Sequence, residues 1–587
     1  MKKVIALLLA LLMLTAATVM TGCSGEEKEE DKGYMINVFL ASNINTFDPA
    51  DGLTDEAGQR ILSLVYEGLT RIDEKGKLQK AIAKNWSYKY SDKEDCYVLE
   101  INLKNTHWND GRAVSADDFV FAWKRQLEPE FMSETASALM LIKNARAVKH
   151  GDMTIDDLGL YAPDTTLIQV QFDQDIDYMQ FLENCASLSL MPLREDLVVK
   201  MPDWGSTPAT IATNGPFYVK NFKRGEIMEI ERNIYYYRDN EEDRLAKYVT
   251  PYRFTIDLTK DADAQLAAFD EGTVSFISEL PLSQRAARAA EAVVSDTNSV
   301  GTFVLNTTKA PFNKKEARQA LSVALDRNEI VKILTFAKPA GGLVGDKVWE
   351  TVTGTSFRQT GGSLINAAGD ISKAKSLLSA AGVSSGKFTI KIREGNPSDL
   401  AIAEYAKGVW EQLGFSVTIK EMGYVFYENP MEYQLYTDDF STDYRNGDFD
   451  VIMIDYNQSV DPFTTLGAYS IPFAGGAMDL ANQNYDLVPH IGGYSNEAYD
   501  AVMEEAFAII NDRAARSAKL HEAEKILMDD MPVIPLIEYQ NAYLIKDNLV
   551  GIKGSYIGMP IFNKMKDKDY VPATEPEETE APETVAE

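Results

Sequence analysis

The sequence has 587 residues, of which 45% are hydrophobic and 25% charged, so it is long enough for two or three folded domains. Its formal net charge of -31 argues against nucleic acid as a partner, because the phosphates would be repelled. The acidic excess is equally compatible with a cleft that attracts amine-bearing solutes and with a surface that like charge keeps soluble.

The first residues have the pattern of a secretory signal. Lys2 and Lys3 precede an apolar run over residues 4–20, which small residues follow instead of a stop-transfer cluster. A permanent membrane helix is therefore the weaker interpretation. The string Met20-Thr21-Gly22-Cys23 resembles a bacterial lipobox. This resemblance implies that Cys23 becomes a lipidated N-terminus, followed by an acidic tether.

The alternative for Cys23 is an ordinary signal peptide with an incidental cysteine. The chain has three cysteines, and a bond between Cys96 and Cys185 would still leave Cys23 over. An odd cysteine in an exported protein needs a role, which favours the lipid anchor. Acyl chains, at about 0.8 kcal/mol per buried methylene, would hold the protein to a membrane.

Short strands and helices alternate from residue 34 onward, without a repeat of about 20 to 50 residues that would indicate a solenoid. This alternation predicts an α/β architecture with a sheet covered by helices. An acidic tail with prolines ends the chain and is predicted to be disordered. The predicted strands cover 34–48, 96–104, 166–172, 301–308, 388–394, 416–422 and 449–456, and the predicted helices cover 54–73, 115–127, 314–334 with a kink near Asp326, 401–415 and 496–528.

Motifs for catalysis or metal binding are missing from the sequence. The four histidines form no pair at i and i+4, and the cysteines lack the close spacing of a zinc site. We find no G-x-S-x-G elbow and no phosphate-binding loop, and the glycines near Gly341 predict a flexible loop. A pair of catalytic carboxylates stays open as an alternative, although no string points to one. We therefore expect no cofactor, no metal and no enzymatic activity.

Several strings in the expected order resemble the oligopeptide-binding proteins of bacterial ABC importers. The resemblance implies an α/β fold with two lobes, of the type II periplasmic-binding-protein-like class and its three-domain oligopeptide-binding variety. It also implies a monomeric, non-enzymatic receptor, anchored at the extracytoplasmic face of the cell membrane, that closes around an oligopeptide and delivers it to ABC permease subunits. The strings cover residues 48–69, 103–129, 212–237, 305–331 and 537–545.

The resemblance implies a discontinuous domain organisation, with hinge strands near 300–305 and 530–536. The expected parts are a lipoprotein signal peptide (1–22), a lipidated cysteine with its tether (23–33), lobe I (34–85, 212–300 and 530–567), accessory domain II (86–211), lobe II (301–529) and a disordered acidic tail (568–587).

Other residues in these strings identify the family and are interpreted as structural. A turn over 108–111 is expected to pack the Trp108 indole into the accessory domain, and a second turn over 214–216 starts a strand of lobe I. Asp326 and Arg327 are expected to fix a helix end through an ion pair.

The resemblance also implies where a ligand lies. A peptide would add a strand to the loop Asp51, Gly52, Leu53 and Thr54, through main-chain hydrogen bonds that read any sequence. Asn306, at the end of a strand in lobe II, is a further candidate for a side chain that faces the cleft.

The family holds the peptide's α-ammonium with an aspartate after a late strand. Here Asp455 and Asp461 compete for that role, and the alternative for each is a helix cap or a solvated loop acid. The arginine that the family places shortly before this aspartate is replaced by the apolar residues 452–454. Recognition of a peptide carboxylate is therefore open.

Two other hypotheses compete with the peptide receptor. The same scaffold could bind a nickel chelate, haem, a sugar or a peptide pheromone, or the chain could be a secreted hydrolase or an adhesin. Turnover of peptides by the purified protein would support the hydrolase, whereas binding without turnover would support the receptor.

Overall fold

The computed structural model describes two units, and every helix and strand below belongs to the unit Met35–Lys568. The expected signal peptide (1–22), the expected lipidation site Cys23, its tether up to residue 32 and the tail from residue 572 to 587 lie outside the described residues. The described residues are 33–40, 44, 46–50, 56–131, 135–201, 204–205, 207–236, 249–350, 355–428, 434–473, 477–479, 484–488, 491–556, 558 and 560–571.

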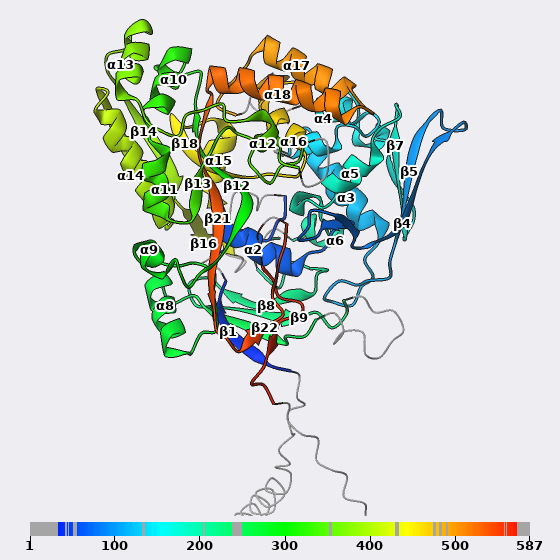
Figure 1. The fold of residues 1–587 in the computed structure, drawn as a ribbon. Coiled ribbons are helices and arrows are strands. Elements are labelled where there is room, and N and C mark those ends of the chain that lie inside the picture. The colour runs from blue at the N-terminus through cyan, green and yellow to red at the C-terminus, as the bar shows by residue number, and fades with distance from the viewer. Residues whose placement is uncertain are drawn as a thin grey trace, which may run out of the picture. The chain divides into compact units, whose positions relative to one another are not determined.

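One 11-stranded sheet organises most of this unit (Figure 1). We call its two sides the first half-sheet and the second half-sheet, and they meet at the long strands β12 (Val293–Leu305) and β21 (Val533–Ile545). The first half-sheet contains β11 (Phe276–Ile277), β1 (Met35–Phe39), β10 (Arg253–Asp257), β9 (Ile227–Arg232) and β8 (Phe217–Lys223). The second half-sheet contains β18 (Val451–Asn457), β14 (Gly386–Arg393), β15 (Phe415–Met422) and β13 (Ala337–Pro339).

The antiparallel ladder between β12 and β21 is irregular at two places near its middle. Val293 to Asp296 pair with the C-terminal part of β21, pairing resumes at Val300 opposite Glu538, and a second shift of register lies between Gly301 and Thr302. Thr297 Oγ1 bridges the first irregularity by donating to Tyr539 O at 2.8 Å, while Asn298 Nδ2 donates to Gln458 O, after β18, at 2.5 Å. The irregular residues 297–299 thus lie just before the stretch expected to act as a hinge, and hinge motion itself stays a prediction.

Helices α10 (Lys315–Ala324), α11 (Arg327–Leu334), α13 (Ile371–Ala380) and α14 (Pro397–Glu411) accompany the second half-sheet. Trp410 of α14 is fully buried and its ring centroid lies 5.3 Å from that of Phe303 and 5.6 Å from that of Phe388. Its Nε1 donates to Leu321 O at 3.0 Å, which satisfies the only polar atom of the indole. The parallel strands β14 and β15, joined by α14, confirm the α/β class.

Two predicted helices are each split by a capping residue. The helix predicted over 314–334 ends at Ala324 and restarts at Arg327, because Asp326 accepts a hydrogen bond from Asn328 N at 2.9 Å. The helix predicted over 496–528 consists of α17 (Glu497–Ala508) and α18 (Arg513–Asp530), with Asp512 as the second cap. The break at Asp326 lies where a kink was predicted, whereas the prediction of one continuous helix over 496–528 was wrong.

The expected ion pair between Asp326 and Arg327 is also replaced by hydrogen bonds. Arg327 is 1% exposed, and it turns inward to donate from Nε to Pro535 O at 2.8 Å and from Nη2 to Ser322 Oγ at 3.1 Å. The guanidinium therefore ties α11 to β21, while Asp326 caps the helix by itself.

A separate four-stranded sheet, which we call the accessory sheet, has the order β4 (Ala83–Ser91), β5 (Cys96–Leu103), β7 (Leu167–Phe172) and β6 (Leu160–Asp164). Helix α3 (Ala116–Leu127) accompanies it and begins with the predicted capping box of Ser115 and Asp118. Trp108 is fully buried and its Nε1 donates to an Asp118 carboxylate oxygen at 3.1 Å, so the structural interpretation of this indole is confirmed.

Cys96 and Cys185 are separate, buried, free thiols, so the bond considered between them is not formed. Burial raises the pKa of the Cys185 thiol, which keeps it protonated and unreactive.

The accessory sheet and its helices contact α17 and α18 through charged groups. Arg146 of α4 (Ala145–Lys149) donates to Glu504 at 2.9 Å, and Arg513 pairs with Asp177 and, at 3.4 Å, with Glu183. Figure 1 shows α17 and α18, in orange, beside these blue and cyan elements.

The remaining described elements are short or peripheral. They are α2 (Glu56–Val65), β2 (Thr70–Ile72), β3 (Leu78–Lys80), α5 (Tyr178–Asn184), α6 (Glu195–Val198), α8 (Ala262–Glu271), α9 (Arg285–Arg288), α12 (Phe357–Gly361), β16 (Tyr424–Glu428), β17 (Gln434–Asp438), α15 (Asp439–Asn446), α16 (Pro462–Gly467), β19 (Ala477–Asp479), β20 (Asn484–Val488), β22 (Leu549–Val550), β23 (Lys553–Gly554), β24 (Pro560–Ile561) and β25 (Lys566–Asp567).

The turn before β8 confirms the structural interpretation of residues 214–216. Asn214 Nδ2 donates to Glu67 O at 2.8 Å, and Glu67 N donates back to Asn214 Oδ1 at 3.1 Å. A Cβ on Gly215 would lie 2.5 Å from the carbonyl carbon of Val65. Only glycine fits where these two backbones approach.

We predict that Gly215→Ala lowers the free energy of unfolding by about 2 kcal/mol, because the new methyl group meets backbone that has little room to move. Gly408→Ala is the matched control, since Gly408 lies within α14 and its added Cβ would meet nothing within 4 Å. Urea unfolding should show a loss for the first variant and a small gain for the second. Equal stability of the two variants would contradict the close approach.

Glu538 gives the fold a dependence on pH. It is 7% exposed, its Oε2 accepts a hydrogen bond from Asp346 N at 2.8 Å, and burial raises its pKa from 4.5 to about 7. The folded state therefore retains this proton at a pH at which the unfolded chain has released it. The resulting stabilisation is complete below pH 4.5 and is lost as the pH rises through 7.

We expect Glu538→Gln to remove this loss, which amounts to about 3 kcal/mol between the two pKa values. Urea unfolding of the parent and the variant at several pH values tests this. The variant should gain stability relative to the parent as the pH rises from 5 to 7. Parallel pH profiles would rule out a raised pKa for Glu538.

Candidate ligand-binding site

The larger of two described cavities lies between the half-sheets and measures about 600 Å³. Its walls follow the C-terminal ends of β1 and β11 on one side and of β14 and β18 on the other. Ligands of open α/β sheets bind outside the carboxyl ends of the strands, which is the position of this cavity. The lining residues used below are Arg60, Ser278, Glu279, Arg393, Asp399, Phe440, Met453, Ile454, Asp455 and Tyr539.

The wall on the first half-sheet has a fixed charge pair. Arg60 of α2 is 8% exposed, and its Nη1 lies 2.8 Å from Glu279 Oε1. The same nitrogen approaches Leu40 O at 3.5 Å, where Ser278 Oγ also donates at 2.6 Å. This network orients Arg60 and Glu279 at the edge of the cavity.

The wall on the second half-sheet presents Asp455 near the end of β18. Asp455 pairs with Gly301 of β12, and a Cβ at Gly301 would lie 3.2 Å from Asp455 Oδ1. Arg393 lies 4.4 Å above the Phe440 ring and donates to Ser441 Oγ at 3.2 Å. An acidic and a basic side chain therefore line this wall together.

β18 also borders the cavity beyond the end of its pairing with β14, where Met453 and Ile454 are 2% and 1% exposed. Its pairing with β14 consists of Ile390 with Val451 and Lys391 with Ile452, and among the described residues this pairing does not continue past Ile452. Met453, Ile454 and Asp455 beyond that point line the cavity. A strand edge of this kind can accept an extended ligand through main-chain hydrogen bonds.

The two competing aspartates have different surroundings. Asp461 is 5% exposed, each of its carboxylate oxygens lies 3.0 Å from a nitrogen of Arg516, and Oδ1 accepts from Phe463 N at 3.0 Å. It thus caps α16 inside an ion pair and lines neither described cavity. Asp455 lines the larger cavity, and its contact with a ligand stays a prediction.

Asn306 does not line either cavity. Its Nδ2 donates to Gly447 O at 2.9 Å and to Phe449 O at 3.0 Å, and its Oδ1 accepts from Thr308 N at 3.1 Å. These bonds hold a loop, and contact with a ligand stays a prediction. Asp51, Gly52, Leu53 and Thr54 lie outside the described residues.

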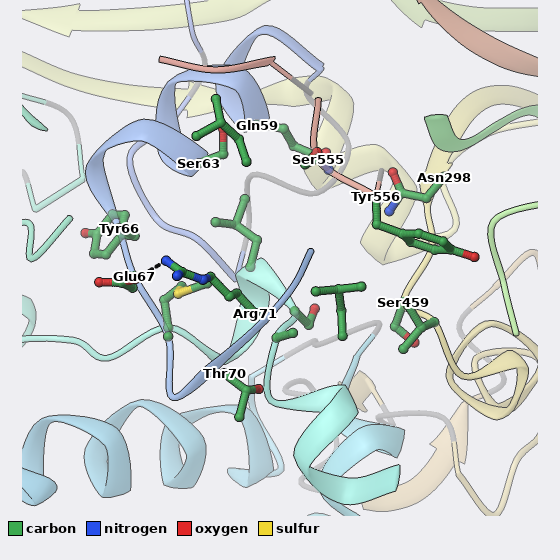
Figure 2. Close-up of a pocket in the computed structure, with 18 of the residues that line it drawn as sticks. Gln59, Ser63, Tyr66, Glu67, Thr70, Arg71, Asn298, Ser459, Ser555 and Tyr556 are labelled. Atoms are coloured by element: carbon green, nitrogen blue, oxygen red, sulfur yellow. Dashed lines mark ion pairs between the residues drawn. The ribbon is translucent and has the colours of Figure 1, made fainter. Parts of the chain in front are cut away.

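A smaller cavity of about 260 Å³ borders the next residues of β18 and the loop after it (Figure 2). Its lining residues come from α2, β2, the accessory part of the chain and the C-terminal strands. Sequence reasoning missed both this cavity and the pair of Arg60 and Glu279, since the residues that form them are far apart in the chain. The lining residues used below are Leu64, Glu67, Arg71, Ile72, Glu183, Leu188, Met191, Asn457 and Ile561.

A model of the bacterial extracellular solute-binding proteins, family 5, middle, matches residues 77–474, which is more than half of the chain. The chain belongs to this family. The dipeptide-binding protein DppE of Bacillus subtilis is 25% identical over 568 residues, covering 93% of this chain and 96% of DppE. The periplasmic murein peptide-binding protein MppA of Escherichia coli is 29% identical over 525 residues, covering 86% and 88%.

Solved structures show the same fold. The substrate-binding domain of an oligopeptide ABC transporter from Bacillus anthracis superposes with a TM-score of 0.74 at 24% identity, covering 91% of this chain and 99% of that one. OppA of Listeria monocytogenes bound to peptide gives 0.73 at 21% identity, covering 92% and 100%. The fold class expected from the sequence is therefore confirmed.

Two classes of feature are missing from the part of the chain that the structure describes. None of its helices is both long enough and apolar enough to cross a membrane. Its histidines, cysteines and carboxylates form no group of three or more that could hold a metal ion.

We predict that Asp461→Asn lowers the free energy of unfolding by about 3 kcal/mol, because Arg516 loses its buried partner while the amide oxygen can still cap α16. Asp448→Asn, at an exposed loop position, is the control and should leave stability unchanged. Thermal unfolding of both variants provides the measurement. A melting temperature of the Asp461 variant equal to that of the parent would show that the ion pair contributes nothing.

Proposed function

We propose that this chain is the solute-binding component of a bacterial ABC importer, and that it captures oligopeptides and delivers them unaltered to the permease subunits. Family membership supports a binding protein, and the names of its relatives support peptides as the ligands. The observation that carries the proposal is the cavity between the half-sheets, whose wall contains Asp455 and the part of β18 that has no β14 partner among the described residues.

A peptide would bind there chiefly through its backbone. The edge beyond Ile452 would pair its N–H and C=O groups with those of a peptide of any sequence once Met453 and Ile454, which are 2% and 1% exposed, are uncovered. Asp455 would hold the α-ammonium, since a carboxylate favours a cation in a partly desolvated site. The loop of Asp51 to Thr54 and the side chain of Asn306 stay proposed contacts of the same ligand.

Closure would bring the two half-sheets together around the peptide. We assign lobe I to residues 34–85, 212–300 and 530–567, accessory domain II to 86–211 and lobe II to 301–529. The break in the β12 and β21 ladder at 297–299 is the place where backbone geometry can change with the least loss of pairing. The protein would act as a monomer, because one chain supplies both walls of the cavity.

We further propose that Cys23 carries lipid and anchors the protein at the extracytoplasmic face of the cell membrane. The lipobox-like string and the odd number of cysteines support this placement.

A different solute is the second candidate. The family scaffold also occurs in a probable deoxycholate-binding periplasmic protein, YgiS of Escherichia coli, which is 26% identical over 548 residues. A pheromone receptor, PrgZ, has the same fold, with a TM-score of 0.73. Gentle purification followed by mass spectrometry separates these ligand classes, and short mixed peptides are the expected result.

We predict that Asp455→Asn weakens the binding of short unmodified peptides at least tenfold, or about 1.4 kcal/mol, because the ligand ammonium loses its counter-charge. Calorimetry on the parent, this variant and Asp448→Asn provides the measurement, and only the first substitution should reduce affinity. Peptides with an acetylated amino group should bind the parent and the Asp455 variant alike. An unchanged affinity of the variant would remove Asp455 from the site, and cleavage of the peptides would overturn the receptor function.

A further inference from the structure

The smaller cavity is the next space along β18 from Asp455. Asp455 lines the larger cavity and Asn457 the smaller one, and residues two apart on a strand point to the same face, about 7 Å from each other. A peptide whose ammonium is held at Asp455 therefore has the smaller cavity within reach of its next residues.

The walls of the smaller cavity are largely apolar. Leu64, Ile72, Leu188, Met191 and Ile561 contribute them from four separate stretches of the chain. A volume of about 260 Å³ is below the range of about 300 to 1,000 Å³ that holds a drug-sized ligand. The space therefore fits one side chain or one chain end instead of a whole peptide.

Among the described lining residues, the charged groups are Glu67, Arg71 and Glu183. Glu183 is 7% exposed and lies 3.4 Å from Arg513 Nη1, which offsets its charge. The Glu67 side chain is 10% exposed, and its carboxylate pairs with Arg71.

Arg71, in contrast, has an exposed side chain and only a weak ion pair. Its side chain is 60% exposed, and the ion pair it forms with Glu67 is long, at 3.5 Å. Its backbone is fixed, because β2 pairs Arg71 with Gln79 of β3. Figure 2 shows the guanidinium turned toward Glu67, among the residues that line the cavity. A guanidinium has five N–H donors in a planar fork, and one long contact leaves most of them available.

A carboxylate is the ligand group that this fork binds best, since two parallel N–H···O bonds form at once. The apolar walls would cover the methylene groups that carry the carboxylate, and exclusion of water would strengthen the ion pair.

We propose that the smaller cavity is a specificity pocket for a carboxylate of the bound peptide, with Arg71 as its counter-ion. This inference rests on the proposed peptide-binding function and names the class of peptide preferred. The carboxylate comes either from an acidic side chain or from the C-terminus of a short peptide. The apolar residues 452–454 offer no positive charge for a carboxylate of the ligand. Arg71, from the first part of the chain, thus supplies this charge.

The test is calorimetry with matched peptides that differ only in this charge. One pair has glutamate or glutamine at the second or third position, and the other pair has a free or an amidated C-terminus. The parent should bind the acidic member of at least one pair tenfold more tightly, and the pair concerned identifies the source of the carboxylate. Arg71→Met should abolish this preference while the affinity for the neutral peptides changes less than threefold.

Two further variants make the result specific. Arg71→Lys keeps the charge but not the fork and should retain only part of the preference. Lys75→Met, at an exposed position of the β2–β3 turn, should retain all of it. Equal affinity of the parent for both members of each pair, or a preference that survives Arg71→Met, would overturn the assignment while leaving peptide binding intact. No binding of any peptide by the parent would instead overturn the peptide-binding function and this assignment with it.

Discussion

Main-chain pairing between β12 and β21 holds the two half-sheets in one molecule. Both strands have 13 residues, and each contributes to both halves, so neither half-sheet is complete without them. The pairing is irregular over 297–299, where Thr297 replaces a ladder bond by a side-chain bond, and again between Gly301 and Thr302. The ladder therefore holds the two half-sheets side by side, while its irregular middle is where the angle between them can change.

The candidate site depends on that ladder, because its two walls come from opposite ends of it. β18 lies directly beside β12, and Asp455 occupies the space that Gly301 leaves by having no side chain. Arg60 and Glu279 approach from the other wall. The cavity therefore contains charges of both signs, and it suits a zwitterionic backbone better than it suits a ligand of one sign.

Local signals predicted the fold class and many of the helices and strands correctly. The capping box of Ser115 and Asp118, the turn at Gly215 and the alternating strands are all determined by residues close together in the chain. The helices over 314–334 and 496–528 were overextended because their apolar period continues through Asp326 and Asp512, where a capping aspartate outweighs it. Both aspartates could have been recognised in the sequence as N-caps of a following helix.

The geometry of the site was less accessible to sequence reasoning. Asp455 was one of two candidates, and only the ion pair of Asp461 with Arg516 separates them. Arg60 and Glu279 are 219 positions apart, and the walls around Arg71 come from distant segments. Such juxtapositions follow from topology, which no local pattern encodes.

The contact between the accessory part and α17 and α18 includes partly exposed arginine–carboxylate pairs such as Arg146 with Glu504, and Arg146 also lies over the Phe507 ring. Exposed pairs of this kind contribute about 0 to 1 kcal/mol each, and water replaces them with little penalty. An apolar interface at the same place would separate less readily, since its separation would expose a large apolar area to water. A binding protein has to release its ligand in every transport cycle. A contact whose ion pairs salt and water weaken favours this release, so the rate of ligand release should rise with ionic strength.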